Sequence, residues 1–193
     1  MGKILALDIT GSPFRWLSYE QAIYRVAANK IAWSIGDENS LCFHGGVQRI
    51  SGLQSVIYVP PIIALVKSEG MAKHLGDIAL SSTNEILFAR DNYTCSYCGK
   101  TSKKLTRDHI IPTSRGGKDT WLNCTTACQS CNQFKGNRTL DECSMQLLWT
   151  PYIPNRFENF ILSGRNILDD QMQYLQSRVA KNSRILERNF EFS

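Results

Sequence analysis

The chain has 193 residues, of which 42% are hydrophobic and 20% charged, and this predicts a soluble globular protein built as one domain or as one module with extensions. Its longest apolar run, Val56–Val66, is interrupted by Pro60 and Pro61 and is too short to cross a bilayer, so we expect no membrane segment. The N-terminus reaches Asp8 before any stretch long enough for a secretion signal. Together with reduced cysteines, this predicts a cytoplasmic location.

Residues 1–80 are expected to form a small α+β extension. Ile4–Leu7 has the composition of a strand, and a turn follows it at a Gly-Ser-Pro sequence. A helix should begin after Ser18, because a glutamine three residues later completes a capping box. Ile31–Ile35 and Val56–Val59 are further strand candidates.

Residues 82–91 are expected to form a helix that leads into the first of two C-x-x-C pairs. Zn²⁺ prefers four tetrahedral thiolate or imidazole ligands, and two such pairs supply them. A lone pair could be a redox centre, but a glycine follows Cys98, as in a zinc knuckle turn. The sequence therefore predicts a structural zinc ion bound by Cys95, Cys98, Cys128 and Cys131.

Three cysteines lie outside these pairs and have no paired spacing: Cys42, Cys124 and Cys143. The simplest interpretation of each is a small buried hydrophobic residue. Cys124 lies close enough to Cys128 to compete for zinc. Because the paired cysteines already complete a tetrahedron, we expect it to fill an apolar space instead.

The segment between the pairs is polar and basic, and we expect it to be disordered without the metal. Leu105–Ile111 alternates and is rich in threonine and isoleucine, which predicts a short strand. Residues 125–127 can pair back against it after a glycine loop. A helix should then begin at Asn132 and continue to Arg138, with Asn132 and Lys135 on one face.

The order of residues in this segment resembles that of the HNH endonucleases. The matching elements are an Asp-His-Ile-Ile-Pro sequence at 108–112, Arg-Gly-Gly at 115–117, Asn123, and Cys-x-x-Cys-Asn-x-x-Lys-Gly at 128–136. The resemblance implies a ββα-metal fold, in which two strands and a helix hold one divalent cation. One departure is Cys124, where a larger aliphatic residue commonly follows the asparagine.

The resemblance also implies roles for four residues. His109 is expected to be the general base, since an imidazole with an ordinary pKa of about 6.5 can accept a proton near neutral pH. Asp108 and Asn132 are expected to ligate a catalytic Mg²⁺ or Mn²⁺, because these ions prefer oxygen ligands. Asn123 should support the site, either by bonding loop backbone groups or by orienting the imidazole.

Basic residues are concentrated in the same segment. Between Phe88 and Leu140 the sequence contains nine lysines and arginines and three acidic residues. The net charge of the segment is therefore 9 − 3 = +6, whereas that of the whole chain is +5. Such a concentration favours a phosphate polymer as partner, with double-stranded DNA as our first expectation. The expected contact residues are Lys104, Arg107, Arg115, Lys135 and Arg138.

Residues 141–193 are expected to form a helical tail. Leu168, Met172, Leu175 and Val179 recur at intervals of four, three and four, which predicts an amphipathic helix. The stripe covers less than two heptads, so it favours internal packing over a dimer seam.

These features combine into an α+β fold in which a zinc-stapled ββα-metal (HNH) module at residues 81–140 follows the N-terminal extension and precedes the tail. The expected activity is metal-dependent hydrolysis of DNA phosphodiester bonds. Two alternatives remain open: a zinc-dependent DNA-binding module that does not cut, and a nuclease acting on structured RNA. The N-terminal extension is our hypothesis for the carrier of sequence specificity.

Overall fold

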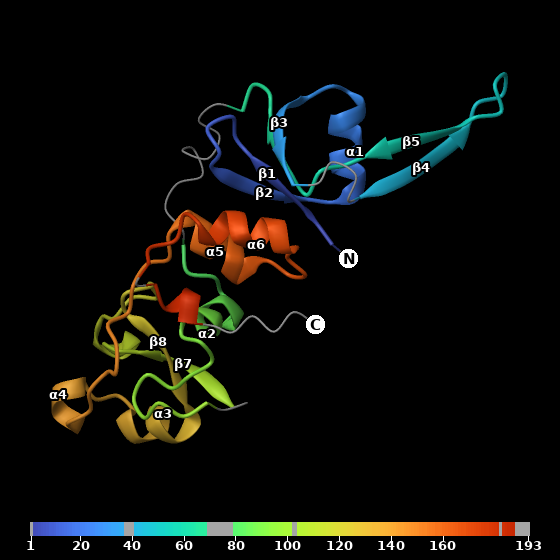
Figure 1. The fold of residues 1–193 in the computed structure, drawn as a ribbon. Helices are drawn as coiled ribbons and strands as arrows, with labels where there is room; N and C mark the ends of the chain where they lie inside the picture. The colour runs from blue at the N-terminus through green and yellow to red at the C-terminus, as the bar shows by residue number, and fades with distance from the viewer. Residues whose placement is uncertain (1, 37–40, 69–78, 102–103, 182, 188–193) are drawn as a thin grey trace. The chain divides into compact units, whose positions relative to one another are not determined.

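The computed structural model describes residues 2–36, 41–68, 79–101, 104–181 and 183–187 (Figure 1). The chain forms two compact units. The first contains residues 1–76 and 163–178, and the second contains residues 77–162 and 179–193. In the described part of the chain, no helix combines the length and the apolar character needed to cross a bilayer.

A four-stranded sheet forms the centre of the first unit. Its central strands, β1 (Ile4–Leu7) and β6 (Ile62–Leu65), are parallel to each other. β2 (Pro13–Leu17) pairs antiparallel with β1, and β3 (Ile31–Ile35) pairs antiparallel with β6. The predictions of strands at 4–7 and 31–35 are confirmed. β6 was not predicted, although it is almost fully buried.

Two helices complete the first unit. α1 (Tyr19–Ala27) begins after Ser18, and the predicted capping box is present: the Ser18 hydroxyl accepts from the Gln21 N–H, and the Gln21 side chain accepts from the Ser18 N–H. α6 (Asp169–Gln176) belongs to this unit because the Gln171 amide donates to two backbone oxygens beside β1 and β6, at 2.8 Å each. Met172 and Leu175 of the predicted stripe are buried, which agrees with internal packing.

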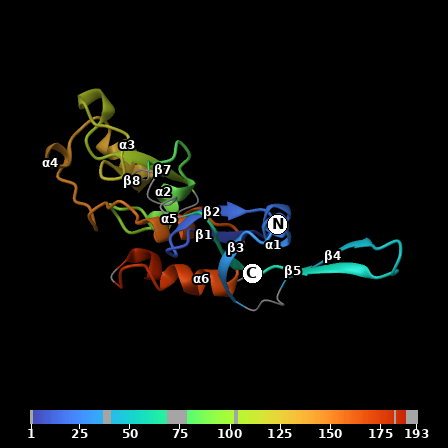
Figure 2. The ribbon, with the colours of Figure 1, turned by 90° about the horizontal axis from the view of Figure 1, so that it is seen from above.

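A β-hairpin made of β4 (Cys42–Val47) and β5 (Gln54–Tyr58) extends from the first unit (Figure 2). Sequence analysis placed a strand at Val56–Val59, which overlaps β5, and did not predict β4. Most residues along both strands are exposed, and so are several apolar residues at or near the tip: Val47, Ile50, Leu53 and Val56.

The second unit contains the predicted two strands and helix. β7 (Leu105–His109) pairs antiparallel with β8 (Cys124–Cys128), and α3 (Gln129–Lys135) follows directly after β8. α2 (Glu85–Arg90) precedes them and is shorter than the predicted helix. The other helical segments among the described residues of this unit are a 3₁₀ turn at Thr113–Arg115, α4 (Leu140–Cys143), α5 (Arg156–Ser163) and a second 3₁₀ turn at Arg184–Glu187.

A buried ion pair attaches α2 to β8. Arg90 and Asp91 are both inaccessible to solvent, and their side chains are 2.9 Å apart. The Arg90 guanidinium also donates to the backbone oxygens of Trp121 and Cys124, and Asp91 accepts from the Thr126 N–H. The pair therefore satisfies backbone groups of β8 and of the turn before it, as well as its own charges.

Replacing Arg90 by methionine should destabilise the second unit by about 3–5 kcal/mol, because it leaves the Asp91 carboxylate buried without its counter-charge. The free energy of opening can be measured from hydrogen exchange of the β8 amides. The matched control is Arg115→Met, which breaks an exposed ion pair with Glu142 and should change little. Equal effects of the two substitutions would contradict a special role for the buried pair.

Candidate functional site

Four cysteine sulfurs converge where the chain enters and leaves the two-stranded sheet. The sulfurs of Cys95, Cys98, Cys128 and Cys131 all lie within 4.8 Å of one another. A tetrahedral ion with metal–sulfur bonds near 2.3 Å requires sulfurs about 3.8 Å apart, and the Cys98 and Cys128 sulfurs are 3.9 Å apart. The donor set and its spacing therefore fit a metal ion such as zinc.

The backbone around Cys95 favours a thiolate. Burial alone would raise the pKa of Cys95, but the backbone N–H groups of Cys128, Cys98 and Tyr97 outweigh it and lower the pKa to about 7. A turn with Gly99 at a φ of 72° makes this arrangement possible, since such a backbone conformation favours glycine. The loop thus prepares one ligand for metal binding.

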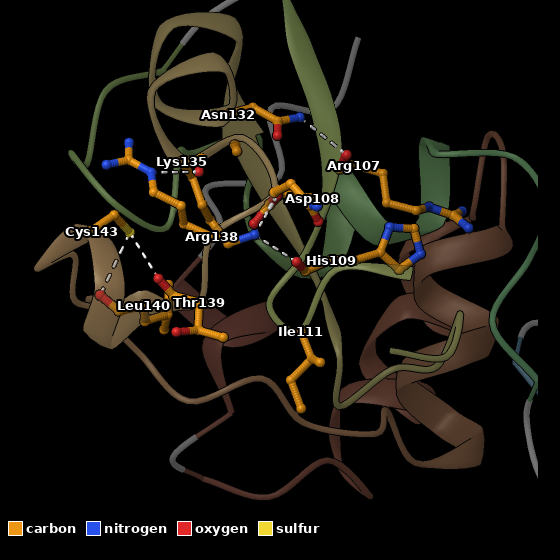
Figure 3. A network of polar contacts seen from close by, with 12 residues as sticks. Arg107, Asp108, His109, Ile111, Asn132, Lys135, Arg138, Thr139, Leu140 and Cys143 are labelled. Atoms are coloured by element: carbon orange, nitrogen blue, oxygen red, sulfur yellow. Dashed lines mark hydrogen bonds and ion pairs between the residues drawn. The ribbon is translucent and has the colours of Figure 1, made fainter. Parts of the chain in front are cut away.

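Asp108 lies on the face of β7 that α3 covers (Figure 3). One of its carboxylate oxygens is 3.1 Å from the Lys135 ammonium, and the other accepts from the Tyr97 hydroxyl. Lys135 also donates to the His109 backbone oxygen at 2.7 Å. Both charged side chains are almost completely buried, so the pair anchors α3 to the end of β7.

Asn132 lies on the same face, one helical turn before Lys135. Its amide nitrogen donates to the Thr106 hydroxyl at 2.8 Å and to the Arg107 backbone oxygen at 3.3 Å. Both bonds use the nitrogen, which orients the amide oxygen towards the side of Asp108 (Figure 3). That oxygen is the atom of Asn132 that can serve a ligand.

The imidazole of His109 belongs to the opposite face of β7. Its Nε2 is 2.9 Å from Oδ1 of Asp119, a residue of the loop between the strands. Arg107 bonds both oxygens of the same carboxylate, at 2.9 and 2.7 Å. Its other terminal nitrogen donates to the Ser81 and Thr83 backbone oxygens.

The ionisation of Asp119 determines which His109 nitrogen carries the proton. Burial acts to raise the pKa of Asp119, but hydrogen bonds from Cys124, Arg107 and His109 overcome it and lower the pKa below its ordinary value. Near neutral pH the group is therefore a carboxylate, which can only accept hydrogen bonds. Nε2 of His109 must then be the donor, and in the neutral ring Nδ1 is unprotonated.

Cys124 completes this second cluster. Its sulfur is 3.1 Å from Asp119 Oδ1, and the three ligand atoms of His109, Asp119 and Cys124 lie within 4.8 Å of one another. Burial, followed by the Asp119 charge, raises the pKa of the Cys124 thiol to about 12. The side chain packs with Leu87 and Trp121, so the expected filling of apolar space is also observed.

A cavity of about 280 Å³ lies at the end of β7 and the start of the loop that follows. The residues that line it include Asp108 and His109, whose side chains lie on opposite faces of β7. Its lining consists of Arg107, Asp108, His109, Pro112, Thr113, Ser114, Asn132, Lys135, Gly136 and Asn137. Three of the four predicted catalytic residues therefore share one cavity.

Asn123, the fourth of them, holds the loop. Its side chain accepts from the Ile111 N–H at 2.9 Å and donates to the Ile111 and Lys118 backbone oxygens. Gly117 passes so close that a Cβ on it would lie 1.8 Å from the Ile111 oxygen, so only glycine fits there. Of the two supporting roles expected for Asn123, these contacts correspond to the bonding of backbone groups.

The five basic residues predicted to contact nucleic acid have different surroundings. Arg107 and Lys135 line the cavity, and each is already in an ion pair. Arg115 forms a third, exposed ion pair, while Arg138 donates to backbone oxygens of α3. Lys104 is exposed just before β7. The positive charge counted from the sequence is thus partly neutralised within the module.

Sequence reasoning missed two side chains that shape the site, Tyr97 and Asp119. Tyr97 lies between the two cysteines of the first C-x-x-C pair, and that motif assigns a role only to its cysteines. Its hydroxyl nevertheless donates a hydrogen bond to Asp108. Asp119 was counted only as a charge. Its position between the glycine loop and Asn123 was the one available signal, because a loop acid ten residues after a strand histidine can fold back onto it.

Comparison with known proteins supports the resemblance noted in the sequence. Residues 95–148 match a family model described as HNH endonuclease. A search of curated proteins found no match. The matched segment includes both cysteine pairs, β7, β8 and α3.

Proposed function

We propose, from the match of residues 95–148 to a family model described as HNH endonuclease, that this protein hydrolyses DNA phosphodiester bonds with one divalent metal ion and a histidine general base. The observation that carries the proposal is the shared cavity of Asp108, His109, Asn132 and Lys135. It gathers oxygen ligands, a base and a cation in one place. Phosphodiester hydrolysis requires all three.

The oxygens of Asp108 and Asn132 are the proposed ligands of the catalytic ion. A carboxylate and a neutral amide oxygen suit Mg²⁺ or Mn²⁺, which keep the rest of their coordination shell for water and phosphate. Such an ion would neutralise charge on the phosphate and assist the leaving oxygen. Because Lys135 already bonds Asp108, the ion would have to share or replace this ammonium. The displaced ammonium is a natural partner for the substrate phosphate.

His109 is the proposed general base, acting through Nδ1. Asp119 holds Nε2 as a hydrogen-bond donor and leaves Nδ1 free to accept a proton from the attacking water. Arg107 keeps Asp119 ionised and fixed in place. The Arg107–Asp119–His109 series therefore sets the orientation of the base from the face of β7 opposite α3.

The four paired cysteines are the proposed zinc site, with a structural role. They complete a tetrahedron, so no coordination position is open for substrate, and structural zinc sites are closed in this way. Duplex DNA is the first proposed substrate. Exposed cations at Lys104 and Arg115 can approach a phosphate backbone, but the same contacts would serve RNA.

Plasmid cleavage by the zinc-loaded protein tests this proposal. We expect cleavage only after addition of Mg²⁺ or Mn²⁺, and a loss of at least about 100-fold in Asp108→Asn, which keeps the side-chain size but removes the charge that holds the ion. Single-stranded DNA and structured RNA, run in parallel, rank the substrates. Salt-sensitive binding without cutting on every substrate would overturn the nuclease proposal in favour of a binding module.

A further inference from the structure

We propose that His109, Asp119 and Cys124 form a second metal site, selective for a zinc-like transition ion, whose occupation switches the nuclease off. The inhibition of cleavage rests on the proposed function, whereas metal binding by the three side chains does not depend on that function. It concerns a cluster separate from the four paired cysteines and from the Asp108 and Asn132 oxygens.

The geometry of the cluster suits one ion. Asp119 Oδ1 is 2.9 Å from His109 Nε2 and 3.1 Å from the Cys124 sulfur, and all three atoms lie within 4.8 Å of one another. Ligands of a tetrahedral ion lie a little over 3 Å apart, so small side-chain rotations would make room for it. The hydrogen bonds now in place direct the His109 nitrogen and the Cys124 sulfur towards the same atom, Oδ1 of Asp119.

The chemistry of the donors selects the ion. One sulfur, one imidazole nitrogen and one carboxylate oxygen favour Zn²⁺ or Co²⁺ over Mg²⁺, which prefers oxygen ligands alone. Three protein ligands leave a fourth position for water. Binding exchanges the Cys124 thiol proton for the ion, so one proton is released to solvent.

The surroundings allow an ion to enter and remain. The Asp119 side chain is about half exposed, which provides an approach, whereas Cys124 is fully buried and holds the inner side of the site. Arg107 is the nearby cation. It bonds Oδ2 of Asp119 at 2.7 Å, so it can keep this contact while Oδ1 turns to the ion.

Occupation of this site would disable the base directly. An ion on Nε2 needs the lone pair of that nitrogen, so the neutral ring must carry its proton on Nδ1. Nδ1 is the atom proposed to accept the proton from the attacking water. The same cysteine that departs from the family pattern therefore supplies the ligand that makes His109 sensitive to zinc.

Metal binding can be measured apart from activity. Protein whose four paired cysteines are filled with zinc is titrated with Co²⁺, whose thiolate charge-transfer absorption reports a cysteine ligand. In the wild type we expect one further equivalent of Co²⁺ to bind and to produce this absorption. In Cys124→Val we expect neither the additional binding nor the absorption. Asp119→Asn is the second variant, since it removes the negative charge of one ligand and lies outside the core. Cys42→Val is the matched control, because Cys42 is exposed and adjoins His44.

Cleavage with Mg²⁺ is then measured at increasing Zn²⁺. Wild type and Cys42→Val should be inhibited. Cys124→Val, compared with its own rate in the absence of zinc, should require at least about tenfold more zinc for the same fractional inhibition. The proposed site would be ruled out if the wild type bound no second ion, or if Cys124→Val bound the ion and was inhibited by zinc to the same extent as the wild type. If no variant cleaves any substrate, the nuclease proposal fails, and the cobalt titration still decides whether the metal site exists.

Discussion

Replacing His109 by alanine is expected to lower the rate of metal-dependent cleavage by about 10²–10⁴-fold, the usual contribution of a positioned general base. The substitution removes the nitrogen that accepts the water proton but leaves the Asp108, Asn132 and Lys135 network on the other face of β7. Nucleic-acid affinity should therefore stay nearly unchanged. Single-turnover cleavage and a separate binding measurement in Ca²⁺ distinguish the two effects.

His44→Ala is the control for this experiment. His44 is exposed on β4 in the first unit, and its loss should alter neither rate nor affinity. Asp119→Asn adds information about the orientation of the base. Its amide can donate to or accept from Nε2, so it no longer dictates which nitrogen carries the proton, and an intermediate loss of rate is expected. Cleavage by His109→Ala within threefold of wild type would exclude His109 as the base.

Local signals in the sequence predicted the elements that depend on local interactions. The capping box of α1 involves only Ser18 and Gln21, and the alternation of β7 is visible in its own residues. β6 was missed because its neighbours Pro60 and Pro61 were interpreted only as an interruption of an apolar run. What makes Ile62–Leu65 a strand is parallel pairing with β1, more than fifty residues away, and that pairing leaves no local pattern.

The position of α6 was equally hidden from the sequence. Its apolar spacing predicted a helix and internal packing, but nothing in the spacing indicates what the helix packs against. The decisive contacts are those of Gln171 with the Lys3 and Pro61 backbone oxygens. A deletion of residues 1–80 would remove both acceptors. Shortening the β4–β5 hairpin is therefore a cleaner test of whether the first unit carries specificity.

The sequence motif predicted which residues contribute side chains to the candidate site, but not the residues that contact them. Asp108, His109 and Asn132 were identified, and they share a cavity. The motif does not specify their partners, because those come from other parts of the chain: Tyr97 from the cysteine knuckle and Asp119 from the loop. These partners set charge and tautomer, which determine how the named residues can react.

Removing the ion from the four paired cysteines is expected to unfold the second unit. The core cluster that contacts the start of β8 has three buried members, Leu87, Trp121 and Cys124. Structural zinc contributes about 10–16 kcal/mol of apparent binding free energy, which is comparable to or larger than the whole stability of an ordinary domain, about 5–15 kcal/mol. Cys131→Ser should therefore abolish protection of the β7 and β8 amides from hydrogen exchange.

The first unit provides the internal reference for this measurement, since its four-stranded sheet has its own core of Ile4, Ala6, Leu17, Ala22, Val59 and Ile63. Amides of β1 and β6 should keep their protection in Cys131→Ser, and Cys42→Ser should leave both units protected. Chelation of the wild-type metal should reproduce the Cys131→Ser pattern. Metal analysis shows whether the site is empty. If it is empty and the β7 and β8 amides still keep full protection, the strands and α3 are stable on their own. In that case the Lys135–Asp108 and Arg90–Asp91 pairs, rather than the cysteines, would hold the catalytic cavity together.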